Sequence, residues 1–250
     1  MVNRQSILVI ALLLVAPAAH AQQWLVNSAI NNQIVETAIC DDSLRKHEKL
    51  PDVCAKYPKY AGAMGASNPA SAPPVVTANT AALTFRPAAG NDVLRKFADG
   101  LGKNPEERQQ FLQIVTASKA SFEQQYAARG WKNHVAGAYA YFIGSIGYVW
   151  SGVEPDAATQ GRLFDALSST LAASPDLANA SDQQKSELYD TLIVCASLPL
   201  LFYVDGTQQN NTAEIEQARA MATEYSRRIM QSEPSQLAAM LQPATGGSTR

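Results

Sequence analysis

Few residues of this chain have the type and spacing that chemistry requires. Histidine occurs at only three positions, and none of them belongs to a zinc-binding spacing such as H-E-x-x-H. The G-x-S-x-G turn, the S-x-x-K motif and the glycine-rich phosphate loop are also missing from the sequence. We therefore favour a non-enzymatic protein without a cofactor or metal. The enzymatic alternative is a hydrolase that draws an unrecognised pair of carboxylates from Glu123, Glu154, Asp165, Glu187 and Asp190.

The histidines have simpler interpretations than catalysis. His134 stands at the start of a long uncharged stretch, so it either lines a pocket or is a partly buried residue at a helix end. The second interpretation is the commoner one for a lone histidine. His47 lies in the charged run 45–49, which is typical of a solvated face.

The cysteines indicate an oxidising compartment. Cys40 and Cys54 are close in sequence, and the pattern predicts one local disulfide between them. Closing a loop of this length stabilises a fold by about 3 kcal/mol on the chain-entropy model. Cys195 stands in an apolar run without a nearby histidine or arginine, so we expect a buried, unreactive thiol.

The amino terminus has the three parts of a secretory signal peptide. Arg4 supplies the positive charge, residues 7–15 form an apolar run, and Ala19-His20-Ala21 is a small-x-small cleavage site. The apolar run is about half the length of a membrane-spanning helix. We expect cleavage after Ala21 and a periplasmic or secreted mature protein that begins at Gln22.

Composition then divides the mature chain. Apolar residues make up 46% and charged residues 17% of the sequence, which excludes a wholly disordered protein. The net charge of −2 provides no basic field for nucleic acid. We expect an N-terminal arm at 22–57, a linker rich in Ala, Pro and Ser at 58–82, a helical bundle at 83–232 and a C-terminal tail at 233–250.

Capping signals predict that the bundle is all-α, with about six helices. Asn104-Pro105 followed by two glutamates is a strong helix start, and Ser181 with Gln184 forms a capping box. The expected helices cover about 91–100, 104–130, 133–150, 155–171, 181–206 and 212–230.

Two of these helices are apolar on nearly every side, which marks them as central. Residues 135–153 and 191–204 contain no charge. Gly137, Gly144 and Gly147 place small side chains along one ridge of the first helix, where we expect the second helix to approach closely, or a small apolar ligand to find room. Both helices also resemble a membrane hairpin, but the tyrosines of the first and the short length of the second argue against insertion.

Three segments resemble an uncharacterised family of exported, all-helical bacterial proteins. They are residues 133–140, residues 181–190 and Phe85-Arg86-Pro87. The resemblance covers about 85–230, and it implies the helical bundle and the export. It implies no activity and no catalytic residues.

The leading hypothesis is therefore an exported protein that acts by binding a protein or peptide partner. The alternative is a carrier of a small apolar ligand held between helices. Residues near the uncharged helices that would line such a pocket, or pack closely, are His134, Gly137, Tyr141, Gly144, Gly147 and Tyr189.

Overall fold

The computed structural model of the chain describes residues 36–37, 40, 43–44, 49–57, 60, 62–63 and 80–241. The predicted signal peptide, His47, most of the predicted linker and the last nine residues lie outside this part. The account below is confined to the described residues.

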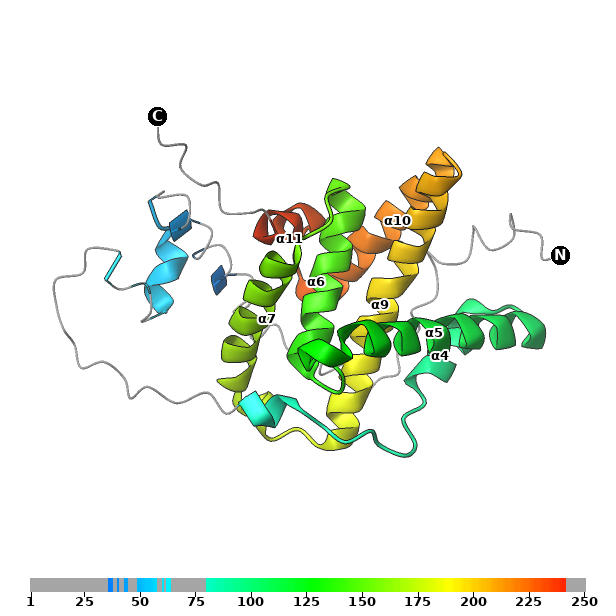
Figure 1. The fold of residues 1–250 in the computed structure, drawn as a ribbon, viewed down its shortest axis with the longest axis horizontal. Coiled ribbons are helices and arrows are strands. Elements are labelled where there is room, and N and C mark those ends of the chain that lie inside the picture. The colour runs from blue at the N-terminus through cyan, green and yellow to red at the C-terminus, as the bar shows by residue number, and fades with distance from the viewer. Residues whose placement is uncertain are drawn as a thin grey trace.

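The described part is all-α, as the sequence predicts (Figure 1). It contains no strand, and its one isolated antiparallel bridge joins Thr84 to His134. The α-helices are α4 (Val93–Leu101), α5 (Pro105–Tyr126), α6 (Val135–Ser151), α7 (Ala157–Ala172), α8 (Pro175–Ala178), α9 (Asp182–Gln208), α10 (Thr212–Tyr225) and α11 (Pro234–Met240). Short helical turns complete it: η1 (Asp52–Lys56), η3 (Thr80–Leu83), η4 (Ala127–Arg129) and η5 (Ser226–Met230), the last of which is π-helical.

The helices begin where polar side chains satisfy their first backbone N–H groups. The Asn104 side chain accepts from the Glu107 N–H at 2.9 Å. At the start of α9, the Gln184 N–H donates to Ser181 Oγ and the Ser181 N–H donates to Gln184 Oε1. These contacts confirm the predicted helix starts. The starts could be predicted because capping depends on residues that are near in sequence.

Helices α6 and α9 form the centre of the bundle and run parallel to each other (Figure 1). Contacts between them join Tyr141 to Ser197, 56 residues apart in sequence, and Tyr148 to Tyr203. The distance in sequence between contacting residues stays nearly constant along the pair, which happens only when two helices run in the same direction. Helices α7 and α11 pack on α6, α10 packs on α9, and α4 and α5 pack on α9.

Helix α9 continues to Gln208, slightly beyond the predicted end near residue 206. The uncharged stretch 191–204 was expected to be too short to span a membrane, but the whole helix of 27 residues is long and apolar enough to do so. However, 72% of its most apolar window is buried inside the protein, which favours the interpretation as a core helix.

The core also extends beyond the predicted boundary at residue 232. Helix α11 lies within the segment 233–250 that was expected to be a tail. Leu237 and Leu241 are buried and belong to the main hydrophobic cluster. Their apolar side chains fill space beside α6, so at least residues 234–241 are part of the bundle.

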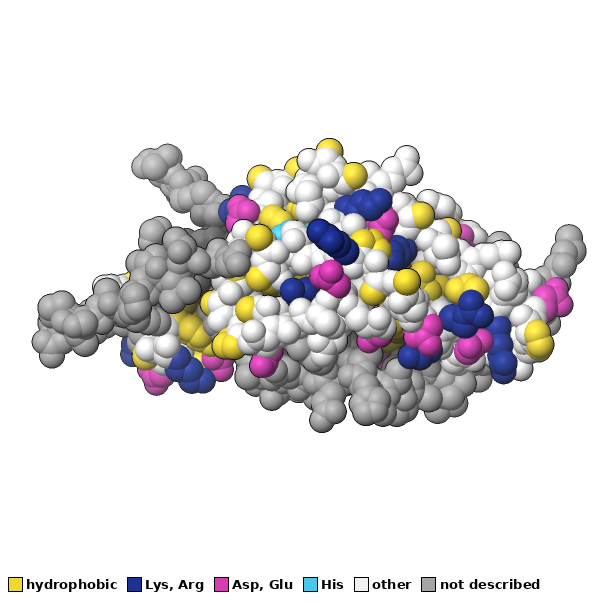
Figure 2. Space-filling model, turned by 90° about the horizontal axis from the view of Figure 1, so that it is seen from below, with side chains coloured by type: hydrophobic (Ala, Val, Ile, Leu, Met, Phe, Trp, Pro, Cys, Tyr) yellow, Lys and Arg dark blue, Asp and Glu magenta, His cyan; other side chains and the backbone are white. Residues whose placement is uncertain are grey.

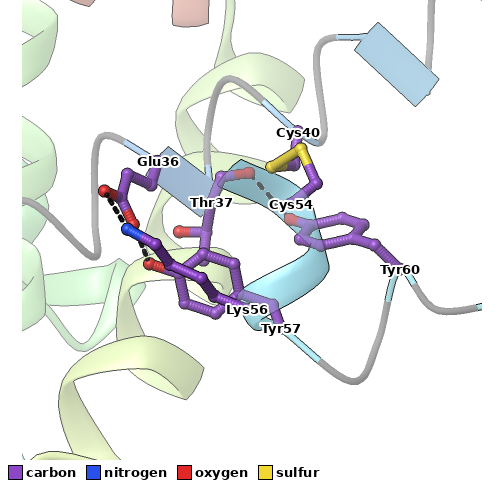
Figure 3. The surroundings of a disulfide bond; sticks show 7 residues. All are labelled: Glu36, Thr37, Cys40, Cys54, Lys56, Tyr57 and Tyr60. Atoms are coloured by element: carbon purple, nitrogen blue, oxygen red, sulfur yellow. Dashed lines mark hydrogen bonds and ion pairs between the residues drawn. A yellow bond between two sulfur atoms is a disulfide. The ribbon is translucent and has the colours of Figure 1, made fainter. Parts of the chain in front are cut away.

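The N-terminal arm has a small core of its own (Figure 3). The predicted disulfide between Cys40 and Cys54 is present, with an S–S distance of 2.02 Å. Both cysteines are buried with Leu50 and Tyr60, and the Tyr60 hydroxyl donates to the Thr37 carbonyl oxygen at 2.7 Å. Because two of these four buried residues are the cystine itself, the disulfide is a main part of the packing in this arm.

An ion pair lies on the surface of the same arm (Figure 3). The Glu36 carboxylate accepts from Lys56 Nζ at 3.0 Å and from the Tyr57 hydroxyl at 2.5 Å. The Tyr57 hydrogen bond, together with the Lys56 charge, lowers the pKa of Glu36. These contacts tie the turn η1 to the segment that precedes Cys40.

Candidate functional site

The histidine that the sequence analysis singled out is buried at the amino end of α6. His134 is the residue immediately before the helix and is 7% exposed. Its ring centroid lies 5.0 Å from that of Phe164, and its Nδ1 atom is buried without a hydrogen-bond partner. Burial lowers the pKa of the imidazole. Because the ring is buried against Phe164 and burial disfavours its charged form, the geometry fits a neutral packing residue.

Around His134 lies an aromatic cluster that joins α5, α6, α7 and α9. The Trp131 ring is stacked between Tyr126, at a centroid distance of 4.6 Å, and Phe164, at 5.3 Å. Phe122 contacts the rings of both Tyr141 and Tyr189. The members of this aromatic cluster are Phe85, Phe122, Tyr126, Trp131, Tyr141, Phe164 and Tyr189.

Two of the predicted site residues use their hydroxyls inside this cluster. The Tyr189 oxygen accepts from the Asn133 backbone N–H at 3.3 Å, and Asn133 has a positive φ of 55°. The Tyr141 hydroxyl and Ser197 Oγ are 3.2 Å apart and share a hydrogen bond. Burial raises the pKa of both tyrosines, so both hydroxyls stay neutral.

A buried polar group lies next to Tyr189. Lys119 Nζ is 2.6 Å from Asp190 Oδ1. The Asn91 amide donates to Asp190 Oδ2 and to Ser186 Oγ, each at 2.8 Å. Burial raises the pKa of Asp190, while the Lys119 and Asn91 side chains act in the opposite direction.

This polar group fits a structural role better than catalysis. Asp190 is buried, and each of its two carboxylate oxygens already contacts a protein partner. Asn91 precedes α4, Lys119 lies on α5 and Asp190 lies on α9. The group therefore connects three segments of the bundle, and a buried hydrogen-bond network of this kind makes a core more rigid.

The glycines of α6 do not all face the same neighbouring segment. A Cβ atom on Gly137 would lie 2.6 Å from Trp131 Cβ, and one on Gly147 would lie 2.2 Å from Leu241 Cδ1. At Gly144 the nearest contact would be Pro155 Cγ, at an ordinary 3.8 Å. Helix α9 is the main partner of α6, as expected, but at Gly137 and Gly147 the close neighbours are the loop before α6 and the end of α11. The argument that the glycines leave room for a ligand is correspondingly weaker at Gly137 and Gly147.

Two exposed apolar side chains lie three residues apart at the carboxyl end of α6. Trp150 is 41% exposed and Val153 is 65% exposed. Leu201 of α9 is also exposed, but it points elsewhere. It lies two residues from Tyr203, which contacts Tyr148 of α6, and two residues turn a helix by about 200°. We call Trp150 and Val153 the carboxyl-end surface.

The sequence analysis did not single out this surface. Residues 135–153 are apolar on nearly every side, so their periodicity does not distinguish the buried Val149 from the exposed Trp150. The one available signal was the glycine at position 152, which ends α6 with a positive φ of 73°. A residue beside such a helix end is more accessible than one in the middle of the helix.

The described residues include no group of three or more His, Cys, Asp or Glu side chains arranged to hold a metal ion. Cys195 is the one free thiol among them and is buried in α9, where burial raises its pKa.

Comparison with known proteins gives the family of the chain. No curated protein and no solved structure matches the sequence. A family model described as a family of unknown function (DUF6683) matches residues 2–240, which is nearly the whole chain. The chain belongs to this family of unknown function.

Proposed function

We propose that this protein is exported and acts, without catalysis, by binding a protein or peptide through the carboxyl-end surface. One observation carries the proposal, namely that Trp150 and Val153 are both exposed at the carboxyl end of the central helix α6. Single exposed apolar residues are normal on proteins. Adjacent exposed apolar residues form the kind of patch at which proteins bind partners.

The type of side chain supports the same proposal. Tryptophan is enriched among the residues that contribute most to binding at protein interfaces. Trp150 follows Val149, which is fully buried, so its backbone is held by the core. A partner that covers Trp150 would bury a large apolar area without ordering a flexible loop.

The apolar-ligand alternative lacks comparable support. Its argument from the sequence was the space beside the glycines of α6, and protein atoms fill that space at Gly137 and Gly147. A ligand carrier would need a cavity elsewhere in the bundle.

The proposed surface can be tested by affinity purification from envelope extract with a tagged mature chain. We expect one or more specific partners with the natural protein and their loss with the double variant Trp150→Ala, Val153→Ser. The matched control is Ile114→Ala, because Ile114 is also 41% exposed but lies on α5. Partner loss with the control, or partner retention with the double variant, would contradict the proposal.

Export is supported by the signal-like amino terminus and by the Cys40–Cys54 disulfide, since disulfides persist in oxidising compartments. Cell fractionation followed by mass spectrometry of the purified protein tests this part. We expect a mature amino terminus at Gln22 and oxidised Cys40 and Cys54. An intact Met1 with reduced cysteines would contradict it.

A further inference from the structure

We infer that the Cys40–Cys54 disulfide is a redox switch for the N-terminal arm alone. Thiol–disulfide exchange with a dithiol unfolds the arm, while the helical bundle stays folded. The switch lies in a part of the chain that the carboxyl-end surface does not include. Three features support it: the two parts have separate cores, the disulfide dominates the smaller core, and the hydrogen bonds around it are few.

The arm and the bundle bury different sets of side chains. The buried apolar residues of the arm, and those packed against them, are Cys40, Leu50, Val53, Cys54, Tyr57 and Tyr60. The other two hydrophobic clusters of the described part take all their residues from 83–241. Loss of the arm's core therefore removes no side chain from these two clusters.

The disulfide is the main constraint on the arm. The described residues of the arm lie between 36 and 63. A segment shorter than about 40 residues usually needs a disulfide or a metal in order to fold. Apart from the two cysteines, the buried apolar residues of the arm are Leu50 and Tyr60. On the chain-entropy model, a disulfide that closes a loop of this length lowers the population of the unfolded segment roughly a hundredfold.

The hydrogen bonds of the arm close the same loop as the disulfide. Glu36 accepts from Lys56 and Tyr57, and the Thr37 carbonyl oxygen accepts from Tyr60. Each bond joins the chain before the first cysteine to the chain after the second. Figure 2 shows basic and acidic side chains next to each other on the arm, at the left. Ion pairs in contact with water stabilise weakly, so these contacts do not replace the disulfide.

The exchange conserves electrons. One thiolate of the dithiol attacks a sulfur of the cystine and forms a mixed disulfide, and the other cysteine leaves as a thiolate that takes up a proton from water. The second thiolate of the dithiol then attacks the mixed disulfide and releases the remaining cysteine. The arm gains two thiols, and the dithiol becomes a disulfide.

The dithiol reaches the sulfur atoms by local opening. Cys40 and Cys54 are both 0% exposed, so the arm must open before exchange begins. A small core opens more often than a large one, because local opening costs less free energy than global unfolding. Exchange therefore proceeds from an open arm on a folded bundle.

The test is hydrogen–deuterium exchange of the full mature chain, measured by mass spectrometry with and without dithiothreitol and in the absence of denaturant. We expect dithiothreitol to raise amide exchange in peptides that cover 49–57 by at least about tenfold. Peptides from α6 and α9 should stay unchanged. The double variant Cys40→Ser, Cys54→Ser should show the fast exchange without reductant. Cys195→Ser, which removes the buried thiol of the bundle, should keep the arm protected.

Two leucines of the arm provide a matched pair of variants for the rate of reduction. Leu50→Ala removes part of the buried core and should speed reduction by dithiothreitol about tenfold. Leu44→Ala should leave the rate unchanged, because Leu44 is 37% exposed. Lys119→Ala destabilises the bundle and should also leave the rate unchanged, since reduction requires the arm alone to open.

Contrary results would overturn the inference in distinct ways. An arm that stays protected after reduction, or that is unprotected before it, would show that the disulfide does not control its structure. Faster exchange in α6 and α9 after reduction, or faster reduction of Lys119→Ala, would show that the arm and the bundle unfold together. A disulfide that dithiothreitol leaves intact without denaturant would exclude local opening. The purification experiment above is independent of these results, because it concerns Trp150 and Val153.

Discussion

The two ends of the α6–α9 pair differ in whether their large side chains are buried or exposed. At the amino end, Tyr189 and Phe122 are buried, and the hydrogen bonds around Asp190 close the gaps between segments. At the carboxyl end of α6, Trp150 and Val153 are exposed.

This difference separates stability from recognition within one helix pair. The amino end is covered by α4, α5 and α7, so a change there removes packing that nothing replaces. Trp150 and Val153 of the carboxyl-end surface are exposed, so changes there should affect binding more than folding. The predictions below test that division, from the largest expected effect to the smallest.

Removing the ring of Tyr189 should have the largest effect on folding. Tyr189→Ala should lower the free energy of unfolding by about 3–5 kcal/mol, because the ring is fully buried against Phe85 and Phe122. Tyr189→Phe keeps the ring and should cost only about 1 kcal/mol for the hydroxyl contact to Asn133. Urea denaturation measures both. A loss below about 1 kcal/mol for the alanine variant would contradict the claim that the amino end of the helix pair provides stability.

Removing the cation beside Asp190 should have the next largest effect. Lys119→Ala leaves a buried carboxylate without its ion-pair partner, so we expect a loss of about 2–3 kcal/mol at pH 7. Burial already raises the pKa of Asp190, and the loss of Lys119 raises it further. The charged carboxylate is thus disfavoured in the folded state, and protonation removes the penalty. The deficit should therefore shrink as the pH falls toward about 4.

The control for this prediction is Asp190→Asn in the Lys119→Ala background. Neutral asparagine should abolish the pH dependence of the deficit. The urea midpoint of the Lys119→Ala variant is compared with that of the natural protein at pH 7 and at pH 4. If the difference between the two midpoints is the same at both pH values, Asp190 is not the group responsible.

Alanine substitutions at the α6 glycines should separate them into two kinds. Gly137→Ala and Gly147→Ala should each cost about 1–3 kcal/mol, with the larger loss at Gly137 because its neighbour is the Trp131 backbone. Gly144→Ala should instead stabilise by up to about 1 kcal/mol through helix propensity. Thermal unfolding of the three variants measures the order. Similar losses at all three positions would support the single ridge that the sequence suggested.

His134 should make folding sensitive to mild acid. Burial lowers its pKa in the folded state, so the imidazole stays neutral there while it takes up a proton in the unfolded state below about pH 6.5. Stability should consequently decrease as the pH falls from 7 to 5. His134→Gln should be less sensitive over this range in urea titrations. Identical pH profiles for the two proteins would contradict the burial of a neutral imidazole.

Trp150→Ala should have the smallest effect on folding. Because Trp150 is 41% exposed, we expect a loss of about 1 kcal/mol in the free energy of unfolding, well below that of Tyr189→Ala. Differential scanning calorimetry of this variant beside Tyr189→Ala compares the two ends directly. A loss comparable to that of Tyr189→Ala would mean that Trp150 belongs to the core.

Much of the fold could be predicted from local signals. Asn104, Ser181 and Gln184 mark helix starts, and Cys40 and Cys54 pair as their spacing and context predict. Capping and short-loop disulfides involve residues that are near in sequence, so their physics can be read from the sequence.

The parts that could not be predicted depend on distant segments. Nothing near Gly147 indicates that Leu241 will fill the space beside it, and nothing near Asp190 indicates Lys119 or Asn91 as partners. The exposure of Trp150 likewise depends on which helices cover α6. The last residues of α9 likewise depend on a later segment, because Gly206 packs against Glu214 and Ile215 of α10.

The most direct test of the carboxyl-end surface is photo-crosslinking in living cells. Benzoylphenylalanine would replace Trp150 in one strain and Ile114 in another, since the two residues are equally exposed. We predict a discrete crosslinked adduct from position 150 after irradiation and none from position 114. No adduct at position 150, or the same adducts at both positions, would contradict the assignment of recognition to this end of the helix pair.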